Sequence, residues 1–271
     1  MNSIAKSLLA VVACALCAGT AVAQDGTLKK IKDSGAITIG HRDASIPFSY
    51  YDDNQKPIGY AMDLCAKIVD AVKAELKMPK LEVKYQLVTS ANRIPLIANG
   101  TVDLECGSTT NNETRQKDVA FGLTTYVTEV RTAVKVKSGI SSIAQLNRKT
   151  VVTTTGTTSV QTLRKHQRAQ KINFNEVFGK DHADSFLLLE SGRADAFVMD
   201  DNILAGLIAN AKNPADFKIV GEVLSVEPIA VMIRKDDAAM KKAVDDTIRA
   251  MMKSGDLNKL DRKSTRLNSS H

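Results

Sequence analysis

The sequence predicts an α/β protein with mainly parallel sheets, because short apolar strands alternate with helical segments along most of the chain. The 271 residues are more than one compact domain usually needs and suit two. A hydrophobic content of 44% is enough for a large core and too high for a disordered chain. We find neither an internal repeat nor a low-complexity linker.

The first 23 residues have the pattern of a secretory signal peptide. Lys6 precedes the apolar run Leu8–Ala18, and an A-x-A motif follows at 21–23, so cleavage leaves a chain that starts near Gln24. The run is shorter than the roughly 18 to 20 residues needed to span a bilayer. A buried N-terminal helix and a lipid anchor at Cys14, which ends a lipoprotein-like box, are the alternatives. We expect a soluble protein exported to the periplasm.

The first half of the remaining chain begins with a strand and a helix. Ala36–Ile39 is an apolar run that ends at a glycine, which predicts a strand. Apolar residues then recur at helical spacing from Ala61 to Val72, which predicts an amphipathic helix. The same criteria predict a strand, a short helix, a strand and a long extended segment over Leu81–Leu87, Arg93–Ala98, Val102–Cys106 and Tyr126–Val136.

The second half continues the alternation. Apolar runs predict five strands, over Val151–Thr153, Ile172–Val177, Ala194–Met199, Lys218–Val220 and Ile229–Ile233. Helical spacing predicts helices over Ile143–Leu146, Ser159–Gln167, Ser185–Leu189, Asn202–Ala211 and Ala238–Met252.

The last eleven residues, Asp261–His271, differ in character from the rest of the chain. They read DRKSTRLNSSH, contain one large apolar residue, Leu267, and break the helical pattern that precedes them. The segment resembles translated sequencing-adapter sequence, and a disordered natural terminus is the alternative. We leave these residues out of the fold prediction.

Two cysteines, Cys65 and Cys106, follow the predicted signal peptide. In an oxidising compartment an even, low count suits one structural disulfide. Each cysteine also lies in an apolar context where a buried free thiol is stable. Both interpretations stay open, because a bond requires Cα atoms within about 7 Å, which a sequence does not show.

The charge balance excludes one class of partner. The chain has 37 basic and 30 acidic residues, a formal net charge of +7. The basic residues are scattered and nearly matched by acidic ones, and aromatic residues for base stacking are scarce. We therefore do not expect nucleic-acid binding.

Three segments place an arginine beside hydroxyl side chains in turn-rich sequence near predicted strand ends. The arginines are Arg42, Arg93 and Arg115. Ligands of open α/β proteins bind at such strand ends, and a guanidinium matches a carboxylate. A solvated arginine is the ordinary alternative for any one of them, but three together favour an anion site.

Two further segments carry ligand-binding chemistry. Residues 153–159 read TTTGTTS between a strand and a helix, where free backbone N–H groups favour an anion. Ordinary helix capping is the alternative. Asp200 and Asp201 end an apolar strand, where a carboxylate can pair with an amine. Capping of the next helix is the alternative for Asp201.

The chain resembles the periplasmic glutamate/aspartate-binding proteins of ABC transporters, within solute-binding protein family 3, from about Leu28 to Leu260. The segments that carry the resemblance are GHRDASIPFSYYD, TSANRIPLIANGTVDLECGSTTNNETRQKDVAF, GTTS, KDHADSF, LESGRADAFVMDD and RKDD. The resemblance implies a two-lobed type II periplasmic-binding-protein fold, in which each lobe is a mainly parallel sheet flanked by helices. Two hinge strands would join residues 24–125 plus 226–260 (lobe 1) to residues 126–225 (lobe 2).

The resemblance also assigns ligand-binding residues. It implies that Arg115, Ser108 and Thr110 hold the α-carboxylate of an amino acid, with Thr157 and Thr158 closing on the same group.

The ammonium and the side chain of the ligand have their own sets of residues. The resemblance implies that Asp200 pairs with the α-ammonium. It implies that Arg42 and Arg93, with Ser90 and His182, hold a side-chain carboxylate. Such a set suits L-glutamate or L-aspartate.

The implied function is capture of L-glutamate and L-aspartate by a monomer, without cofactor or metal, and delivery to the membrane permease of an ABC transporter. One alternative is an exported dehydratase-like enzyme on the same fold, with His182, Asp200 or Glu105 as acid or base. Another is a ligand-sensing module for a separate receptor.

Overall fold

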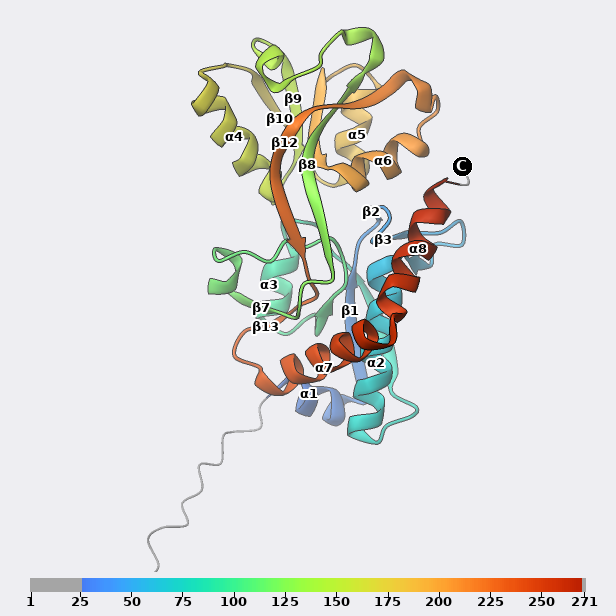
Figure 1. Ribbon diagram of the computed structural model, residues 1–271. Helices are drawn as coiled ribbons and strands as arrows, with labels where there is room; N and C mark the ends of the chain where they lie inside the picture. The colour runs from blue at the N-terminus through green and yellow to red at the C-terminus, as the bar shows by residue number, and fades with distance from the viewer. Residues whose placement is uncertain (1–25, 270–271) are drawn as a thin grey trace, which may run out of the picture.

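The structure is a computed structural model that describes the backbone of residues 26–269 and the side chains of residues 26–263. The predicted signal peptide and Cys14 lie outside the described residues. Two five-stranded sheets, each flanked by helices, form two lobes that are joined by a pair of long strands (Figure 1). The predicted α/β class is confirmed.

Lobe 1 is built on the first sheet. Its strands, in spatial order, are β5 (Glu82–Leu87), β1 (Ala36–His41), β6 (Leu104–Glu105), β13 (Met232–Arg234) and β7 (Val119–Phe121). Its helices are α1 (Thr27–Ser34), α2 (Tyr60–Leu76), α3 (Arg93–Ala98), α7 (Ala238–Ser254) and α8 (Asp256–Ser269), with a 3₁₀ turn, η1, at Arg115–Lys117. A small three-stranded sheet joins β2 (Ala44–Ser45), β3 (Ser49–Tyr51) and β4 (Pro57–Ile58).

Lobe 2 is built on the second sheet. Its strands, in spatial order, are β10 (Asn175–Gly179), β9 (Thr150–Thr154), β11 (Ala196–Asp200), β8 (Tyr126–Lys135) and β12 (Phe217–Ile229). Its helices are α4 (Thr158–Gln170), α5 (His182–Glu190) and α6 (Asp201–Ala209), with short 3₁₀ turns at Val136–Ser138, Ile143–Leu146 and Pro214–Asp216.

Both sheets are mixed rather than mainly parallel as expected. In each, two pairs of neighbouring strands are parallel and two are antiparallel. The reason is the connection between the lobes: the chain crosses on β8 and returns on β12, which pair antiparallel (Figure 1). The ends of these strands reach lobe 1, where Ile229 of β12 bridges to Thr110. The exact lobe boundaries stay a prediction.

Apolar periodicity located most of the helices and strands to within a few residues. The structure adds helices and strands whose sequences show little apolar periodicity. Short or polar elements that were not predicted include α1, the three strands of the small sheet, and β7. The structure also continues as helix α8 through residues that we left out of the fold prediction, and Lys263 there forms an ion pair with Asp63 of α2 at 2.7 Å.

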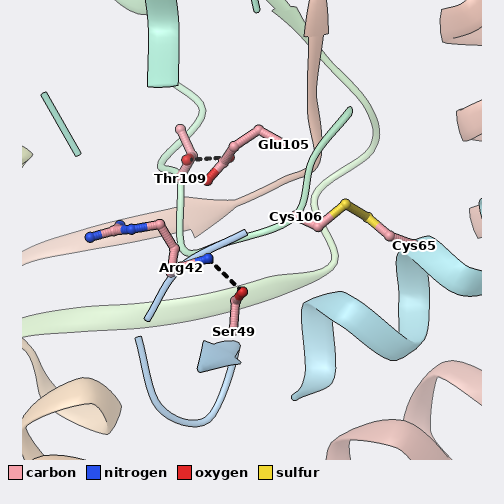
Figure 2. The surroundings of a disulfide bond; sticks show 6 residues. All are labelled: Arg42, Ser49, Cys65, Glu105, Cys106 and Thr109. Atoms are coloured by element: carbon pink, nitrogen blue, oxygen red, sulfur yellow. Dashed lines mark hydrogen bonds between the residues drawn. A yellow bond between two sulfur atoms is a disulfide. The ribbon is translucent and has the colours of Figure 1, made fainter. Parts of the chain in front are cut away.

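The two cysteines are bonded in the structure. The disulfide joins Cys65 in α2 to Cys106 directly after β6, with Cα atoms 6.3 Å apart (Figure 2). It fixes the end of a central strand of lobe 1 to the helix packed on that sheet.

Within residues 26–269, none of the helices combines the length and apolar character that crossing a bilayer requires.

Candidate ligand-binding site

A narrow, closely lined cavity lies between the lobes, at segments that follow the carboxyl ends of strands in both sheets. Its lining residues are Ser90, Arg93, Ser108, Thr110, Thr157, Thr158, His182, Met199 and Asp200. Eight of the ten predicted site residues are among them. The other two, Arg42 and Arg115, lie beside this group without lining the cavity itself, and Met199 was not predicted.

Two of the arginines are buried and have side-chain nitrogens without a hydrogen-bond partner. Arg42 follows β1 and is fully buried; its backbone N–H donates to Ser49 Oγ at 2.8 Å, while none of its three side-chain nitrogens has a hydrogen-bond partner. Arg93 begins α3, is 2% exposed, and has Nε and Nη1 without hydrogen-bond partners. Buried donors are normally satisfied, so these nitrogens indicate a place for acceptors of a ligand.

The third arginine connects the lobes. Arg115 in η1 donates from Nη1 to the Thr110 carbonyl at 2.9 Å and from Nη2 to the Gly156 carbonyl of lobe 2 at 3.3 Å. Gly156 has a φ of +81°, and a Cβ there would lie 2.7 Å from backbone atoms of Ser90 and Ala91. The close approach of the two lobes therefore needs a glycine at this position.

The electrostatic environment favours anions. Burial, and then the positive charge of Arg93, lowers the pKa of Arg42 to about 10 and that of Arg115 to about 9. Burial also lowers the pKa of Arg93. A negative ligand group placed among these guanidinium groups would relieve both the desolvation and the mutual repulsion.

Lobe 2 supplies hydroxyl groups and a helix start. Thr157 is the N-cap of α4, is buried, and donates from Oγ1 to the Thr154 carbonyl at 2.8 Å. Thr158 is the first residue of that helix and is partly exposed. The N-terminal end of α4 therefore lies at the cavity. The N–H groups of a first helical turn have no partner inside the helix and can stabilise an anion there.

His182, the first residue of α5, is a neutral group. Its pKa is well below the usual value because of burial first, and then because of the charges of Arg42 and Arg93. Nδ1 lies 3.0 Å from Thr154 Oγ1, and Nε2 is buried without a hydrogen-bond partner.

Asp200 ends β11 and brings a carboxyl to the same cavity. Burial, and then the charge of Glu227, raises its pKa to about 8, and Oδ1 has no hydrogen-bond partner. A cationic ligand group beside it would restore the carboxylate. Asp201 accepts a hydrogen bond from Thr128 Oγ1 at 2.6 Å.

Thr109, Thr154 and Met199 were not among the predicted site residues, although Thr154 lies in the TTTGTTS segment. Thr154 contacts His182, while Thr109 donates from Oγ1 to Glu105 Oε2 at 2.5 Å. Met199 is an apolar strand residue like its neighbours, so only the fold shows that it faces the cavity. Among residues 26–263, no group of three or more His, Cys, Asp or Glu side chains is arranged to hold a metal ion.

Comparison with known proteins places the chain in a family. Residues 37–265 match the family of bacterial extracellular solute-binding proteins, family 3. The chain is 51% identical to the L-glutamate/L-aspartate-binding protein of Pseudomonas aeruginosa, over 95% of this chain and 86% of that protein. It is 49% identical to the glutamate/aspartate import solute-binding protein of Escherichia coli, over 94% of this chain and 86% of that protein.

Solved structures agree on the fold. The arginine-binding protein of T. maritima, as its P235GK mutant, superposes with a TM-score of 0.78 at 28% identity, covering 89% of this chain and 99% of that one. The cysteine-binding protein of Campylobacter jejuni superposes with a TM-score of 0.79 at 26% identity, covering 90% and 94%. The protein has the type II periplasmic-binding-protein fold and belongs to family 3 of the bacterial extracellular solute-binding proteins.

Proposed function

We propose that the protein binds L-glutamate and L-aspartate between its lobes and delivers them to the permease of an ABC transporter. The two relatives about half identical to it are both named for glutamate and aspartate, which supports this ligand pair. The observation that carries the proposal is the polarity of the cavity. Three buried arginines in and beside the cavity and the buried carboxyl of Asp200 that lines it, with unpartnered donors on Arg42 and Arg93 and an unpartnered acceptor on Asp200, match a ligand with two carboxylates and one ammonium.

The α-amino-acid end of the ligand is assigned to one group of residues. Arg115, Ser108 and Thr110 of lobe 1 would receive the α-carboxylate, with Thr157 and Thr158 at the start of α4 closing over it. Arg115 already reaches the carbonyl of Gly156 in lobe 2, which supports its role at the junction of the lobes.

The side-chain end is assigned to the opposite group. Arg42 and Arg93 would pair with the second carboxylate, assisted by Ser90 and by His182, which is neutral at physiological pH. At the α-amino-acid end, Asp200 would pair with the α-ammonium. A carboxylate buried between two guanidinium groups and hydrogen-bonded by them is far better paired than one at a surface.

The protein acts in this proposal as a receptor without a chemical step, after export to the periplasm. Its relatives are solute-binding proteins. Binding and release then require only that the lobes separate about β8 and β12, as a ligand-dependent shift between open and closed populations.

Isothermal titration of the purified, ligand-stripped protein tests the proposal. L-Glutamate and L-aspartate should bind with micromolar or tighter affinity, which corresponds to about 8 kcal/mol or more. L-Glutamine, which lacks the second carboxylate, should bind at least about tenfold more weakly. Absence of heat with both acidic amino acids, from protein shown to be folded by circular dichroism, would overturn the proposal.

A further inference from the structure

Glu105 is a buried carboxylate that the site described above does not use. It is fully buried in β6 and is not among the residues that line the cavity. Oε2 accepts the hydrogen bond from Thr109, while Oε1 has no hydrogen-bond partner. A buried charge left partly unpaired is costly, so its presence here requires a compensating interaction.

The backbone around Glu105 is held on several sides. Glu105 pairs with Gly40 of β1 and with Met232 of β13, so it lies in the middle of the first sheet. The next residue, Cys106, is bonded to Cys65 of α2 (Figure 2). The carboxylate is thus a fixed charge, in contrast to one on a mobile surface side chain.

This fixed charge lies among the arginines. Glu105 Oε1 is 3.8 Å from Arg93 Nη1, which is an ion pair without a hydrogen bond. A Cβ built on Gly107 would lie 2.3 Å from Glu105 Oε1 and 2.9 Å from Arg42 Cγ. The missing side chain at Gly107 therefore leaves room for both the Glu105 carboxylate and the Arg42 stem.

The negative charge acts on all three arginines. Burial lowers the pKa of Arg42, Arg93 and Arg115, and Glu105 opposes that shift in each of them. Glu105 is therefore one of the carboxylates that offset the positive charges that a ligand carboxylate would meet; Asp200 also acts on Arg93 and Arg115.

We propose that Glu105 is a specificity-determining residue that acts through Arg93 and Arg42: it offsets part of their charge and so limits how strongly the site prefers an amino acid with a second carboxylate over the corresponding amide. The inference deepens the proposed function and rests on it. A neutral residue at this position leaves the arginines with more net positive charge. The dicarboxylic ligand then gains affinity, whereas an amide ligand, which brings no second charge, gains less.

The same charge stabilises the ligand-free protein. Without it, three buried guanidinium groups repel one another with less compensation, so the unliganded form loses stability until a ligand carboxylate arrives. Glu105 therefore lowers the selectivity for a second carboxylate over an amide and raises the stability of the unliganded form.

The test compares Glu105→Gln, Glu105→Asp and Thr109→Val. Glutamine keeps an oxygen for the Thr109 hydroxyl and removes only the charge; aspartate keeps the charge but moves it away from Arg93; valine removes the hydrogen bond and leaves the charge in place. The readout is the ratio of the Kd for L-glutamine to the Kd for L-glutamate, measured by titration, beside the melting temperature of the ligand-free protein.

E105Q should raise the ratio roughly tenfold or more and lower the ligand-free melting temperature. E105D should raise the ratio by less, and it carries the test if the glutamine variant does not fold. T109V should lower the melting temperature without changing the ratio. A ratio that is unchanged or lower in the Glu105 variants, while the parent protein binds L-glutamate, overturns the role of Glu105 alone. A folded parent that binds neither acidic amino acid overturns the proposed function and this inference with it.

Discussion

The two lobes contribute different chemistry to the cavity. Lobe 1 supplies three buried guanidinium groups, from Arg42, Arg93 and Arg115. Lobe 2 supplies the carboxyl of Asp200 and the neutral imidazole of His182, together with hydroxyl groups at the start of α4. In our account lobe 1 binds both carboxylates of a ligand, and lobe 2 then recognises its ammonium. Ligand charge is therefore selected mainly in lobe 1.

The lobes also differ in how they are stabilised. The two cysteines that follow the predicted signal peptide are both in lobe 1 and are bonded to each other. The arginines and the disulfide thus share one lobe.

The largest expected effect comes from removing a lobe 1 arginine. In Arg93→Ala, a ligand carboxylate would be buried without its partner, which costs about 3–5 kcal/mol, or at least about 100-fold in Kd for L-glutamate. Arg164→Ala is the matched control, because the Arg164–Glu176 pair at 2.8 Å involves a half-exposed arginine on lobe 2. Titration should show no change for the control. A loss of affinity for L-glutamate of less than tenfold in R93A would contradict the pairing of Arg93 with a ligand carboxylate.

The disulfide should affect folding strongly. It closes a separation of 41 residues, so replacing both Cys65 and Cys106 with alanine should lower the free energy of unfolding by about 4 kcal/mol. Urea denaturation of the parent and the double variant measures this. Equal stabilities would show that lobe 1 does not depend on its cross-link.

A smaller effect is expected from the lobe 2 carboxyl. Asp200→Asn removes the partner of the ligand ammonium, worth about 1.5–3 kcal/mol, or roughly 10- to 150-fold in Kd. The same change should stabilise the ligand-free protein. Because the folded pKa of Asp200, about 8, lies above the ordinary 3.8, its contribution to stability is full below that lower value and is lost as pH rises through about 8.

The increase in the stability of the ligand-free protein caused by D200N should therefore grow as pH rises from about 4 to about 8. Thermal denaturation across this range, without ligand, is the measurement. A variant that is less stable than the parent throughout would show that the carboxylate is well paired before ligand binds.

The smallest effect is on the pH dependence of binding. The ligand ammonium should lower the pKa of Asp200 from about 8, so binding near pH 7 should release protons. The affinity for L-glutamate should then fall by at most about tenfold for each unit of pH below 8. Titration in buffers of different ionisation enthalpy reports the proton release directly. D200N should release none through this group, and equal release in both proteins would assign the proton elsewhere.

Apolar periodicity explains why the sequence predicts most of the fold. The stripe from Ala61 to Val72 and the run at Ala36–Ile39 correspond to α2 and β1. The two-residue strands of the small sheet are too short to show a period, so pairing across the chain decides them. The mixed character of the sheets also escaped prediction, since strand direction depends on where the chain crosses between lobes.

The candidate site shows the same limit. Arginines beside hydroxyls indicate an anion site from the sequence alone, and the fold brings Arg93, Thr157 and Asp200 to one cavity from segments far apart in the chain. The sequence indicates Glu105 only as a possible acid or base. Its distance from Arg93 and its burial, which give it a different role, follow from sheet pairing that no local pattern records.

The most direct test of the central claim is a crystal structure of the protein with L-glutamate bound. We expect the α-carboxylate at Arg115 and the start of α4, the side-chain carboxylate at Arg42 and Arg93, and the ammonium within hydrogen-bond distance of Asp200. A ligand bound outside the cavity between the lobes, or one whose side-chain carboxylate contacts neither Arg42 nor Arg93, would contradict the account.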